Sequence, residues 1–403
     1  MKSQAAPEES TLKMLDRWWF GYGSPTTLGI FRILIGLIAT LDLLALIGDW
    51  QAWFGEYGFV PAWLGQSWLG KVPVGSNGFE IPRLSLISGV TDPHVAMAFF
   101  ALTLVCAVAT ALGIWTRFSA FFLAIGIVSL HHRNSGVLHG GDTALRIAVL
   151  YLAVSPCGRA CSLDRLIRLR RGEERGAPEI SLWPQRLVQF NLAVVYFTTV
   201  WAKFFGGTWL NGTATWYPPR LAEFHRFPVP GFINEMPFVY ISTYGTLLIE
   251  FSLATLVFFR PLRKYVLLSG VFLHAYIEYS MNIPFFSYLM ISFYVCHFQG
   301  EEITAYAKQL GERMKGTLGL EVHLPEGSKL SGPGERFLKA VDPFGLVRYS
   351  AKTSGESWTA EKVDGKGVNP FRAAALRSPG AWVFLLVPGL WRRTMAGCAE
   401  AAG

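Results

Sequence analysis

Eight apolar segments of 15 to 22 residues recur within the first 300 residues and constrain the fold of this chain more than any other feature. A helix of about 20 apolar residues crosses a hydrocarbon core of roughly 30 Å. Only 16% of the 403 residues are charged and 51% are hydrophobic, whereas about a quarter of the residues in soluble domains are charged. We therefore predict an all-α polytopic membrane bundle with about eight transmembrane helices. The segments are residues 26–47, 94–115, 117–138, 142–156, 187–206, 240–259, 263–281 and 284–298.

Basic residues gather in three of the loops between these segments. Six arginines lie between residues 159 and 175, a second group occupies residues 260–264, and Arg117 lies in a third loop. With eight spans, all three loops fall on one side of the membrane together with both termini. Because basic loops favour the cytoplasm, we expect a multi-pass protein of the plasma (inner) membrane with cytoplasmic N- and C-termini. Orientation in a membrane accounts for the net charge of +8, so membrane lipid is expected as a partner and nucleic acid is not.

The composition changes after Gln299. Residues 300–379 are charged and soluble in character, and the apolar stretch 381–391 is too short to span a bilayer. We therefore predict a transmembrane domain over residues 1–299 and a soluble domain over residues 300–403, in which the stretch 381–391 forms part of the core.

Ionisable residues within the spans are the main candidates for function, because a charged side chain costs about 2.5–3.5 kcal/mol at the centre of a membrane on insertion scales. Two pairs, Asp142 with Arg146 and His274 with Glu278, have the i,i+4 spacing at which helical side chains meet. In one interpretation each pair neutralises itself and fixes helix packing; in the other the polar groups line a cavity that opens outward. Those expected in the outer half are Asp42, His131, His132, Asp142, Arg146, Lys203, His274 and Glu278, with Glu250 near the middle.

The five cysteines do not form a recognisable framework. Cys157 and Cys161 bracket Gly-Arg-Ala in a basic loop, a spacing that matches no strong zinc or redox motif. We therefore interpret them as reduced thiols and predict no metal site.

Three groups of residues point to a known family. The first is His131-His132-Arg133-Asn134 followed by Gly140-Gly141-Asp142. The second runs from Tyr196 to Lys203 and on to Trp209 and Gly212, and the third is His274 followed by Asn282, Phe286 and Ser287. Together they resemble the HTTM (horizontally transferred transmembrane) family, which is related to vitamin K-dependent gamma-carboxylase. The resemblance covers roughly residues 15–300.

The resemblance implies chemistry at the outer membrane face. Gamma-carboxylases oxidise a vitamin K hydroquinone and use the base so formed to remove a proton from a glutamate side chain, which then takes up carbon dioxide. The lysine in the position of Lys203 looks like the base that deprotonates the hydroquinone, and burial supports this role because it disfavours the charged form of lysine. The implied catalytic residues are Lys203, His131, His132 and His274, and the implied cofactor-binding residues are Asp142, Arg146, Glu278 and Trp209.

Two departures from the carboxylases leave the activity open. Ala202 stands where they carry a first lysine, and the chain has no large lumenal C-terminal region. Peptide-glutamate carboxylation is therefore disfavoured, and a carboxylase-like lyase or oxidase acting on a secreted peptide or a lipid is expected if the protein is an enzyme. The alternative is a non-catalytic membrane partner in peptide maturation, export or immunity. In that alternative Lys203 is an interfacial lysine that snorkels and Trp209 belongs to an aromatic belt.

The soluble domain shows a second resemblance. Residues 320–324 predict a short strand, Ser328 and Ser331 follow it, and residues 388–391 lie near the C-terminal end. This pattern resembles the DCC family of thioredoxin-like thiol-disulfide oxidoreductases, whose first strand ends in a Cys-x-x-Cys motif. Serine stands at both cysteine positions here, and a hydroxyl cannot replace a thiolate in disulfide exchange. The resemblance implies a small α/β thioredoxin-like domain without redox activity, retained for docking or regulation.

Overall fold

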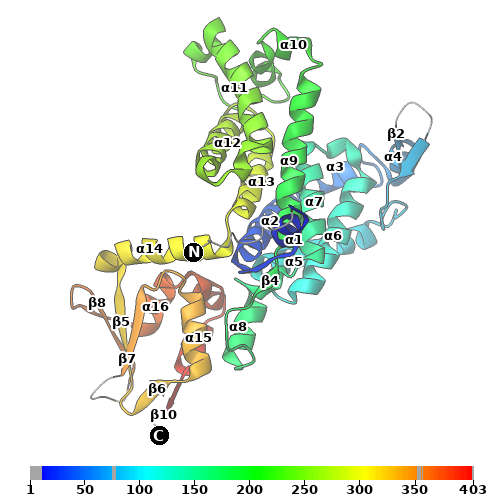
Figure 1. The fold of residues 1–403 in the computed structure, drawn as a ribbon. Coiled ribbons are helices and arrows are strands. Elements are labelled where there is room, and N and C mark those ends of the chain that lie inside the picture. The colour runs from blue at the N-terminus through cyan, green and yellow to red at the C-terminus, as the bar shows by residue number, and fades with distance from the viewer. Residues whose placement is uncertain (1–10, 75–78, 352–354, 356, 402–403) are drawn as a thin grey trace.

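The computed structural model describes residues 11–74, 79–351, 355 and 357–401. It is mostly helical (66%), and its largest sheet lies in the C-terminal region (Figure 1). A helix lies over each of the eight predicted apolar segments. These helices are α2 (Thr26–Leu46), α5 (Pro93–Leu112), α6 (Thr116–Arg133), α7 (Gly140–Val154), α9 (Trp183–Lys203), α11 (Met236–Ala254), α12 (Arg260–Ser280) and α13 (Phe286–Tyr294).

The eight helices differ in apolar character more than the sequence analysis assumed. In the part of the chain that the structure describes, only α2 and α5 are long and apolar enough, by length and composition, to cross a membrane. Helix α6 ends in His131-His132-Arg133, α12 begins at Arg260, and α7 and α13 have only 15 and 9 residues. The prediction of about eight clear spans therefore needs correction, because polar helix ends and short helices reduce the apolar length of the others.

The helices form two groups that share α13. In the first group α2 packs on α5, α5 on α6 and α6 on α7; in the second, α9 packs on α11, α11 on α12 and α12 on α13 (Figure 1). Helix α13 also packs on α2 and α7, and the rings of Phe31 and Phe293 meet edge to face across this contact with centroids 5.4 Å apart. Helices α2 and α5 approach closely because Gly36 has no Cβ, which would lie 2.6 Å from the amide nitrogen of Ala111.

Short elements distinguish the two ends of the helical region. The loops expected outside contain α3 (Trp50–Phe54), α4 (Ala62–Leu69), the hairpin of β2 (Lys71–Val74) and β3 (Phe79–Pro82), α10 (Gly207–Leu210) and the 3-10 turns Ser135–Val137, Ala214–Trp216, Pro218–Arg220 and Gly231–Asn234. The opposite end carries α1 (Thr11–Phe20), the pair β1 (Tyr22–Gly23) and β4 (Ile180–Ser181), and α8 (Leu163–Arg170). The N-terminal segment and the C-terminal domain both lie toward this second end (Figure 1).

A buried arginine closes the end that carries the basic loops. The Arg32 side chain on α2 is fully buried and donates hydrogen bonds to the carbonyl oxygens of Ala111 (3.4 Å), Cys157 (3.3 Å) and Cys161 (2.5 Å). These carbonyls belong to the last turn of α5 and to the loop before α8, so one cation satisfies backbone acceptors that would otherwise lack partners. The sequence analysis did not identify this role for Arg32.

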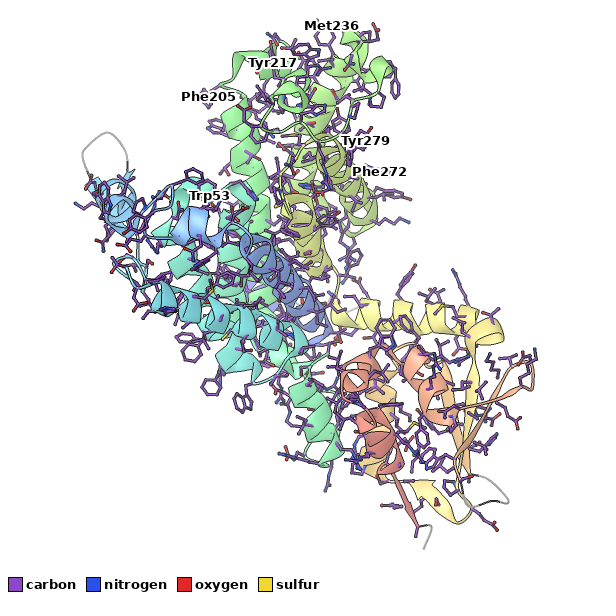
Figure 2. All side chains as sticks on the ribbon, turned by 180° about the vertical axis from the view of Figure 1, so that it is seen from behind. Trp53, Phe205, Tyr217, Met236, Phe272 and Tyr279 are labelled. Carbon is purple, nitrogen blue, oxygen red and sulfur yellow. The ribbon has the colours of Figure 1, made fainter. Side chains whose placement is uncertain are left out.

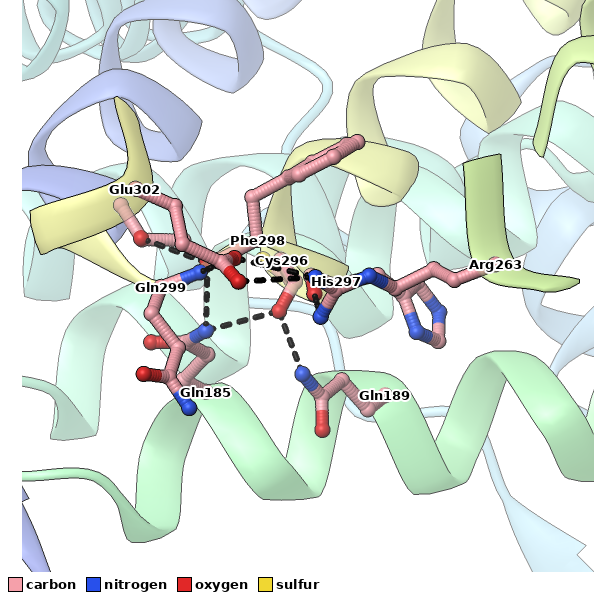
Figure 3. A network of polar contacts seen from close by, with 9 residues as sticks. Gln185, Gln189, Arg263, Cys296, His297, Phe298, Gln299 and Glu302 are labelled. Atoms are coloured by element: carbon pink, nitrogen blue, oxygen red, sulfur yellow. Dashed lines mark hydrogen bonds and ion pairs between the residues drawn. The ribbon is translucent and has the colours of Figure 1, made fainter. Parts of the chain in front are cut away.

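A second polar network joins the helical region to α14 (Gly300–Leu318) (Figure 3). The amide of Gln185 on α9 donates to the carbonyl oxygens of Cys296 (2.8 Å) and Phe298 (2.9 Å). The guanidinium of Arg263 on α12 pairs with Glu302 at 2.9 Å. The chain between α13 and α14 is therefore held by side chains of two other helices, which fixes the direction in which α14 leaves the bundle.

The C-terminal domain is built on a four-stranded sheet with the order β7-β5-β8-β9. Strands β5 (Leu320–Leu324) and β7 (Val347–Ala351) are parallel and joined through α15 (Gly332–Val341), whereas β8 (Thr359–Lys362) and β9 (Gly367–Val368) form an antiparallel hairpin. A separate pair joins β6 (Ser328–Leu330) to β10 (Ala399–Ala401), and the helices α16 (Pro370–Arg377) and α17 (Leu390–Ala396) complete the domain. Val322, Phe337, Val341 and Trp391 form part of its core.

The apolar stretch 381–391 is only partly a core element. Ala381 and Trp391 are buried, but Trp382 and Leu386 are 56% and 75% exposed. The 3-10 segment Pro379–Leu386 borders a cleft of about 1900 Å³ whose other walls include Ile30 of α2. These exposed apolar side chains therefore line the same cleft as residues of α2.

Candidate functional site

Lys203 forms an ion pair instead of reaching freely toward an interface. It is the last residue of α9, and its ammonium donates to both carboxylate oxygens of Glu250 on α11, with 2.5 Å between Nζ and Oε1. The two side chains are only 19% and 12% exposed. The ammonium also lies 4.7 Å from the ring centroid of Trp209, a cation–π contact. Helices α9 and α11 and the turn after α9 thus build one small charged site.

Buried aromatic hydroxyls lie next to this pair. Tyr196, two turns before Lys203 on α9, shares hydrogen bonds with His274 Nε2 (2.9 Å) and with the hydroxyl of Tyr294 (2.8 Å). All three side chains of this network are at most 4% exposed. Glu250 lies near enough to both tyrosines to interact with them electrostatically. The hydrogen bonds of this network therefore join α9, the helix that carries Lys203, to α12 and α13.

Two buried atoms in the same region lack hydrogen-bond partners among the described residues. They are Nδ1 of His274 and the hydroxyl oxygen of Ser287, near the start of α13. The ring of Phe286 lies 5.5 Å from the His274 ring. An unsatisfied buried polar atom costs about 1–3 kcal/mol, so each of these two atoms would be stabilised by a hydrogen-bonding partner.

The predicted residues on α6 and α7 lie in a second cluster. His131 and Asp142 come together with Asp42 of α2, and each of the three offers a ligand atom within 4.8 Å of the others. His132 points elsewhere: its Nδ1 lies 3.0 Å from the carbonyl oxygen of Leu84. His132 and Arg146 instead help to line a cavity of about 540 Å³, which His139 and Arg83 also border. Lys203, His274, Glu278 and Trp209 are not among the residues that line this cavity.

Neither i,i+4 pair forms the contact that the spacing suggested. Glu278 pairs with Arg226 of the loop between α10 and α11, which also donates to the Glu278 carbonyl oxygen at 2.9 Å. Asp142 accepts from the backbone N–H of His139 at 2.6 Å in the capping box of α7, while Arg146 donates to Thr143 at 3.0 Å. Backbone donors at the helix start and a loop arginine offer better geometry than a side chain one turn away.

The family motifs also contain residues that hold loops in place. The Arg133 guanidinium donates to the carbonyl oxygen of Phe54 at 3.1 Å, and the Asn134 amide donates to that of Trp53 at 2.8 Å. Both bonds tie the end of α6 to α3. This part of the first motif therefore positions α3, and the neighbouring His131 contributes to the cluster with Asp42.

Sequence reasoning missed three members of the site. Glu250 was noted as an acid in a span but not paired with Lys203, and Tyr196 and Tyr294 were not proposed as site residues. The spacing of Tyr196 and Lys203, seven residues apart, places them on one face of α9, so this signal was available. Tyr294 has no such pattern, because its contact with Tyr196 depends on how α13 packs on α9.

The positions of the expected thiols in the C-terminal domain carry a structural role. Ser331 is the N-cap of α15: its hydroxyl accepts from the Gly334 N–H at 3.0 Å and donates to the carbonyl oxygen of Cys398 at 3.1 Å. Ser328 lies in β6, which pairs with β10. Burial raises the pKa of the Cys398 thiol to about 11, so the one cysteine near this helix start is a poor nucleophile at neutral pH.

The fold and these sites define a class: a helical protein with membrane-spanning character, polar residues gathered away from its basic loops, and a small α/β domain at its C-terminal end. The HTTM domain matches residues 22–301. Because the match covers most of the chain, the chain belongs to the HTTM family, a family of transmembrane proteins. No curated protein and no solved structure matches the chain significantly.

Proposed function

We propose that all eight helices belong to a membrane-embedded bundle with both termini on the cytoplasmic side. Helices beyond α2 and α5 expose large apolar side chains, among them Ile241 (67%), Leu248 (66%) and Phe272 (66%). Figure 2 shows Phe272 and Phe205 projecting away from the helices of the second group. Water would disfavour such an extended apolar surface, whereas lipid accommodates it. The basic residues of α8 and of the start of α12 lie at the end that carries the soluble domain, which supports a cytoplasmic assignment for that end.

We further propose that the protein is a quinol- or lipid-dependent membrane enzyme with its site at the outer face and Lys203 as the base. The observation that carries this proposal is the Lys203–Glu250 pair, held among protein side chains next to the Tyr196–His274 network. In a low-dielectric site the charged and neutral forms of such a pair are closer in free energy than in water. A proton can then pass from the ammonium to Glu250, which leaves a neutral amine.

The neutral amine is the form that can accept a proton from a hydroquinone hydroxyl. The ammonium of Lys203 would then be restored and Glu250 would keep the proton it received, so one proton would have moved from the hydroxyl to the Lys203–Glu250 pair. Trp209, which contacts the ammonium, and His274, whose Nδ1 has no hydrogen-bond partner among the described residues, are the other residues that would hold such a cofactor. A vitamin K-like hydroquinone is the cofactor class that this arrangement suits. A secreted peptide or a lipid is the substrate class, because the site is assigned to the outer face.

The alternative is a non-catalytic membrane partner in peptide maturation, export or immunity. It is favoured by Ala202 at the position of the first carboxylase lysine and by the ion pair itself, because a carboxylate stabilises a protonated lysine. In this alternative the pair fixes α9 against α11 and has no chemical role.

Complementation of a strain that lacks the gene distinguishes the two functions. Lys203→Arg preserves the positive charge and can still pair with Glu250, but guanidinium stays protonated and cannot act as a base. If the protein is the enzyme, we expect the Lys203→Arg variant to be inserted and folded but to fail to complement the strain. A matched control is Lys264→Arg at the basic end, where the ammonium lies over the Tyr265 ring. Full complementation by Lys203→Arg would refute the base and favour the non-catalytic partner.

We propose that the C-terminal domain is a thioredoxin-like fold of the DCC type that has lost its thiols. Its support is the strand order, in which a parallel pair joined by a helix is followed by an antiparallel hairpin. Ser328 and Ser331 stand at the expected cysteine positions. The test is insulin-disulfide reduction by the full chain in detergent, where we expect no dithiol-dependent turnover; measurable turnover would refute a redox-inactive domain.

A further inference from the structure

Three side chains from three helices of the first group converge in an arrangement suited to a cation. Asp42 on α2, His131 on α6 and Asp142 on α7 each place one ligand atom within 4.8 Å of the other two. His131 and Asp142 are each 7% exposed, and Asp42 is half-buried. Asp42 lies 89 residues before His131, and the packing of α2, α6 and α7 brings the three residues together.

Two features of this cluster favour a bound cation. Nδ1 of His131 is buried and has no hydrogen-bond partner among the described residues, and an unsatisfied buried polar atom is costly. The carboxylates of Asp42 and Asp142 lie close enough to repel each other, and repulsion between like charges is strong where the surroundings are apolar. A cation at the centre would remove both penalties. We propose that Asp42, His131 and Asp142 bind a divalent transition-metal ion.

The donor set and geometry restrict the choice of ion. One imidazole nitrogen and two carboxylate oxygens suit Zn²⁺ and also Mn²⁺ or Fe²⁺, whereas Mg²⁺ prefers oxygen ligands alone. Around tetrahedral Zn²⁺, ligand atoms at about 2.0–2.2 Å from the metal lie about 3.4 Å from one another. The limit of 4.8 Å in the structure therefore requires side-chain shifts of about an ångström. Three protein ligands leave a coordination position open, as in catalytic zinc sites.

Neighbouring groups orient the ligands and provide access. The His139 N–H holds one oxygen of Asp142 at 2.6 Å, and the His139 ring lies 3.7 Å from the same oxygen. Such outer contacts fix the direction of a metal ligand. Arg146 is the nearby cation and balances part of the negative charge, but two carboxylates still leave the cluster with a net negative charge. The cavity of about 540 Å³ is lined by His132, which follows His131 in the chain, and by His139, whose N–H holds Asp142, so it is the proposed entry path.

This site goes beyond the proposed function, because none of its ligands lies on the helices that carry Lys203 and His274. The test uses the full chain without a histidine tag, purified in mild detergent, stripped with a chelator and dialysed separately against Zn²⁺ and Mn²⁺. Bound metal is measured by elemental mass spectrometry. We expect about one tightly bound ion per chain for at least one metal.

The matched variants are Asp42→Asn with His131→Gln, and as controls Asp49→Asn and His94→Gln, which change the same residue types outside the ligand set and outside the cavity. We expect the double ligand variant to bind the metal at least about 10–100-fold more weakly, a loss already seen when only outer-shell partners of metal ligands are removed. The controls should retain wild-type affinity. A thermal unfolding scan in the apo state shows whether each variant is folded.

Two results would overturn the site. One is a folded wild-type chain that binds neither metal stoichiometrically, which would leave a shared proton as the partner of the two carboxylates. The other is equal metal content in the wild-type chain and the double ligand variant, which would locate the ion elsewhere. A loss of Zn²⁺ or Mn²⁺ in the double variant with retention in both controls supports the assignment whether or not Lys203 is a catalytic base.

Discussion

The Lys203–Glu250 pair predicts a specific pattern of stability in single and double variants. Lys203→Met leaves the Glu250 carboxylate in a site where it is only 12% exposed, and Glu250→Gln leaves the ammonium where it is 19% exposed. Either single change strands a charge, whereas the double variant removes both charges and retains two side chains of similar size. The double variant should therefore be more stable than the sum of the single effects predicts.

The size of the effect follows from the burial of the pair. Removal of one partner of a buried ion pair costs about 3–5 kcal/mol. Because neither side chain is completely buried, we expect about 2–3 kcal/mol for each single variant. Loss of the contact between the ammonium of Lys203 and the Trp209 ring accounts for about 0.5–1 kcal/mol of this. The double variant keeps only that smaller loss, whereas the two single losses together amount to about 4–6 kcal/mol, so we expect a coupling free energy of about 3–5 kcal/mol.

Thermal unfolding of the full chain in one detergent measures the pattern. For a domain of 150–250 residues, about 1 kcal/mol shifts the Tm by roughly 2–4 °C, so each single variant should unfold about 4–12 °C below wild type. The double variant should recover most of that difference. Two single variants with wild-type Tm would refute the ion pair and favour a lysine that snorkels, and strictly additive losses would show that Lys203 and Glu250 act independently.

Three further predictions concern other parts of the chain. At the junction, burial alone would raise the pKa of Glu302, but the Gln299 N–H and Arg263 lower it below its ordinary value of 4.5. The stabilisation that Glu302 provides is therefore present above pH 4.5 and is lost as the pH falls through the lowered pKa. Proteolysis near α14 should increase in acid, and Glu302→Gln should abolish that pH dependence. Ser331→Ala removes the N-cap of α15 and should destabilise the soluble domain by about 1 kcal/mol, measured as a lower midpoint in urea, with Ser331→Asp as the capping control. A phosphatase reporter should be active when fused within residues 210–235 and silent when fused after Gly300; activity at the second position would refute cytoplasmic placement of the C-terminal domain.

The helical segments could be predicted from apolar length alone, because burial of apolar surface dominates helix placement in a chain like this one. The residues at which these helices begin and end could not be predicted in this way. Helix α7 begins where His139 and Asp142 form a capping box, and α13 begins after Phe285, whose φ of 56° lies in the left-handed region. Such starts depend on local hydrogen bonds and on contacts with other helices, and a hydropathy pattern contains neither.

The same distinction applies to the candidate site: some residues could be predicted from the sequence, but their contacts could not. Lys203 and His274 could be identified from the cost of a polar group in a span together with the family motifs, but their partners could not. Glu250 lies 47 residues after Lys203, and Tyr294 is 98 residues after Tyr196. Where two interaction modes competed, as for Asp142, the nearby backbone N–H of His139 was the observed partner. Spacing along one helix therefore indicates which side chains share a face, but not which contacts they make.

The start of α13 explains why the two polar clusters lie in one region. His274, at the end of the Lys203 network, has its ring 5.5 Å from that of Phe286. On the other side, a Cβ on Gly141, the residue before Asp142, would lie 3.5 Å from the Phe286 Cα. Phe285 holds a left-handed conformation that residues other than glycine rarely adopt. Such strain persists only where surrounding contacts enforce it, so the packing that seats Phe286 also sets the spacing between the Lys203 network and the Asp42–His131–Asp142 cluster.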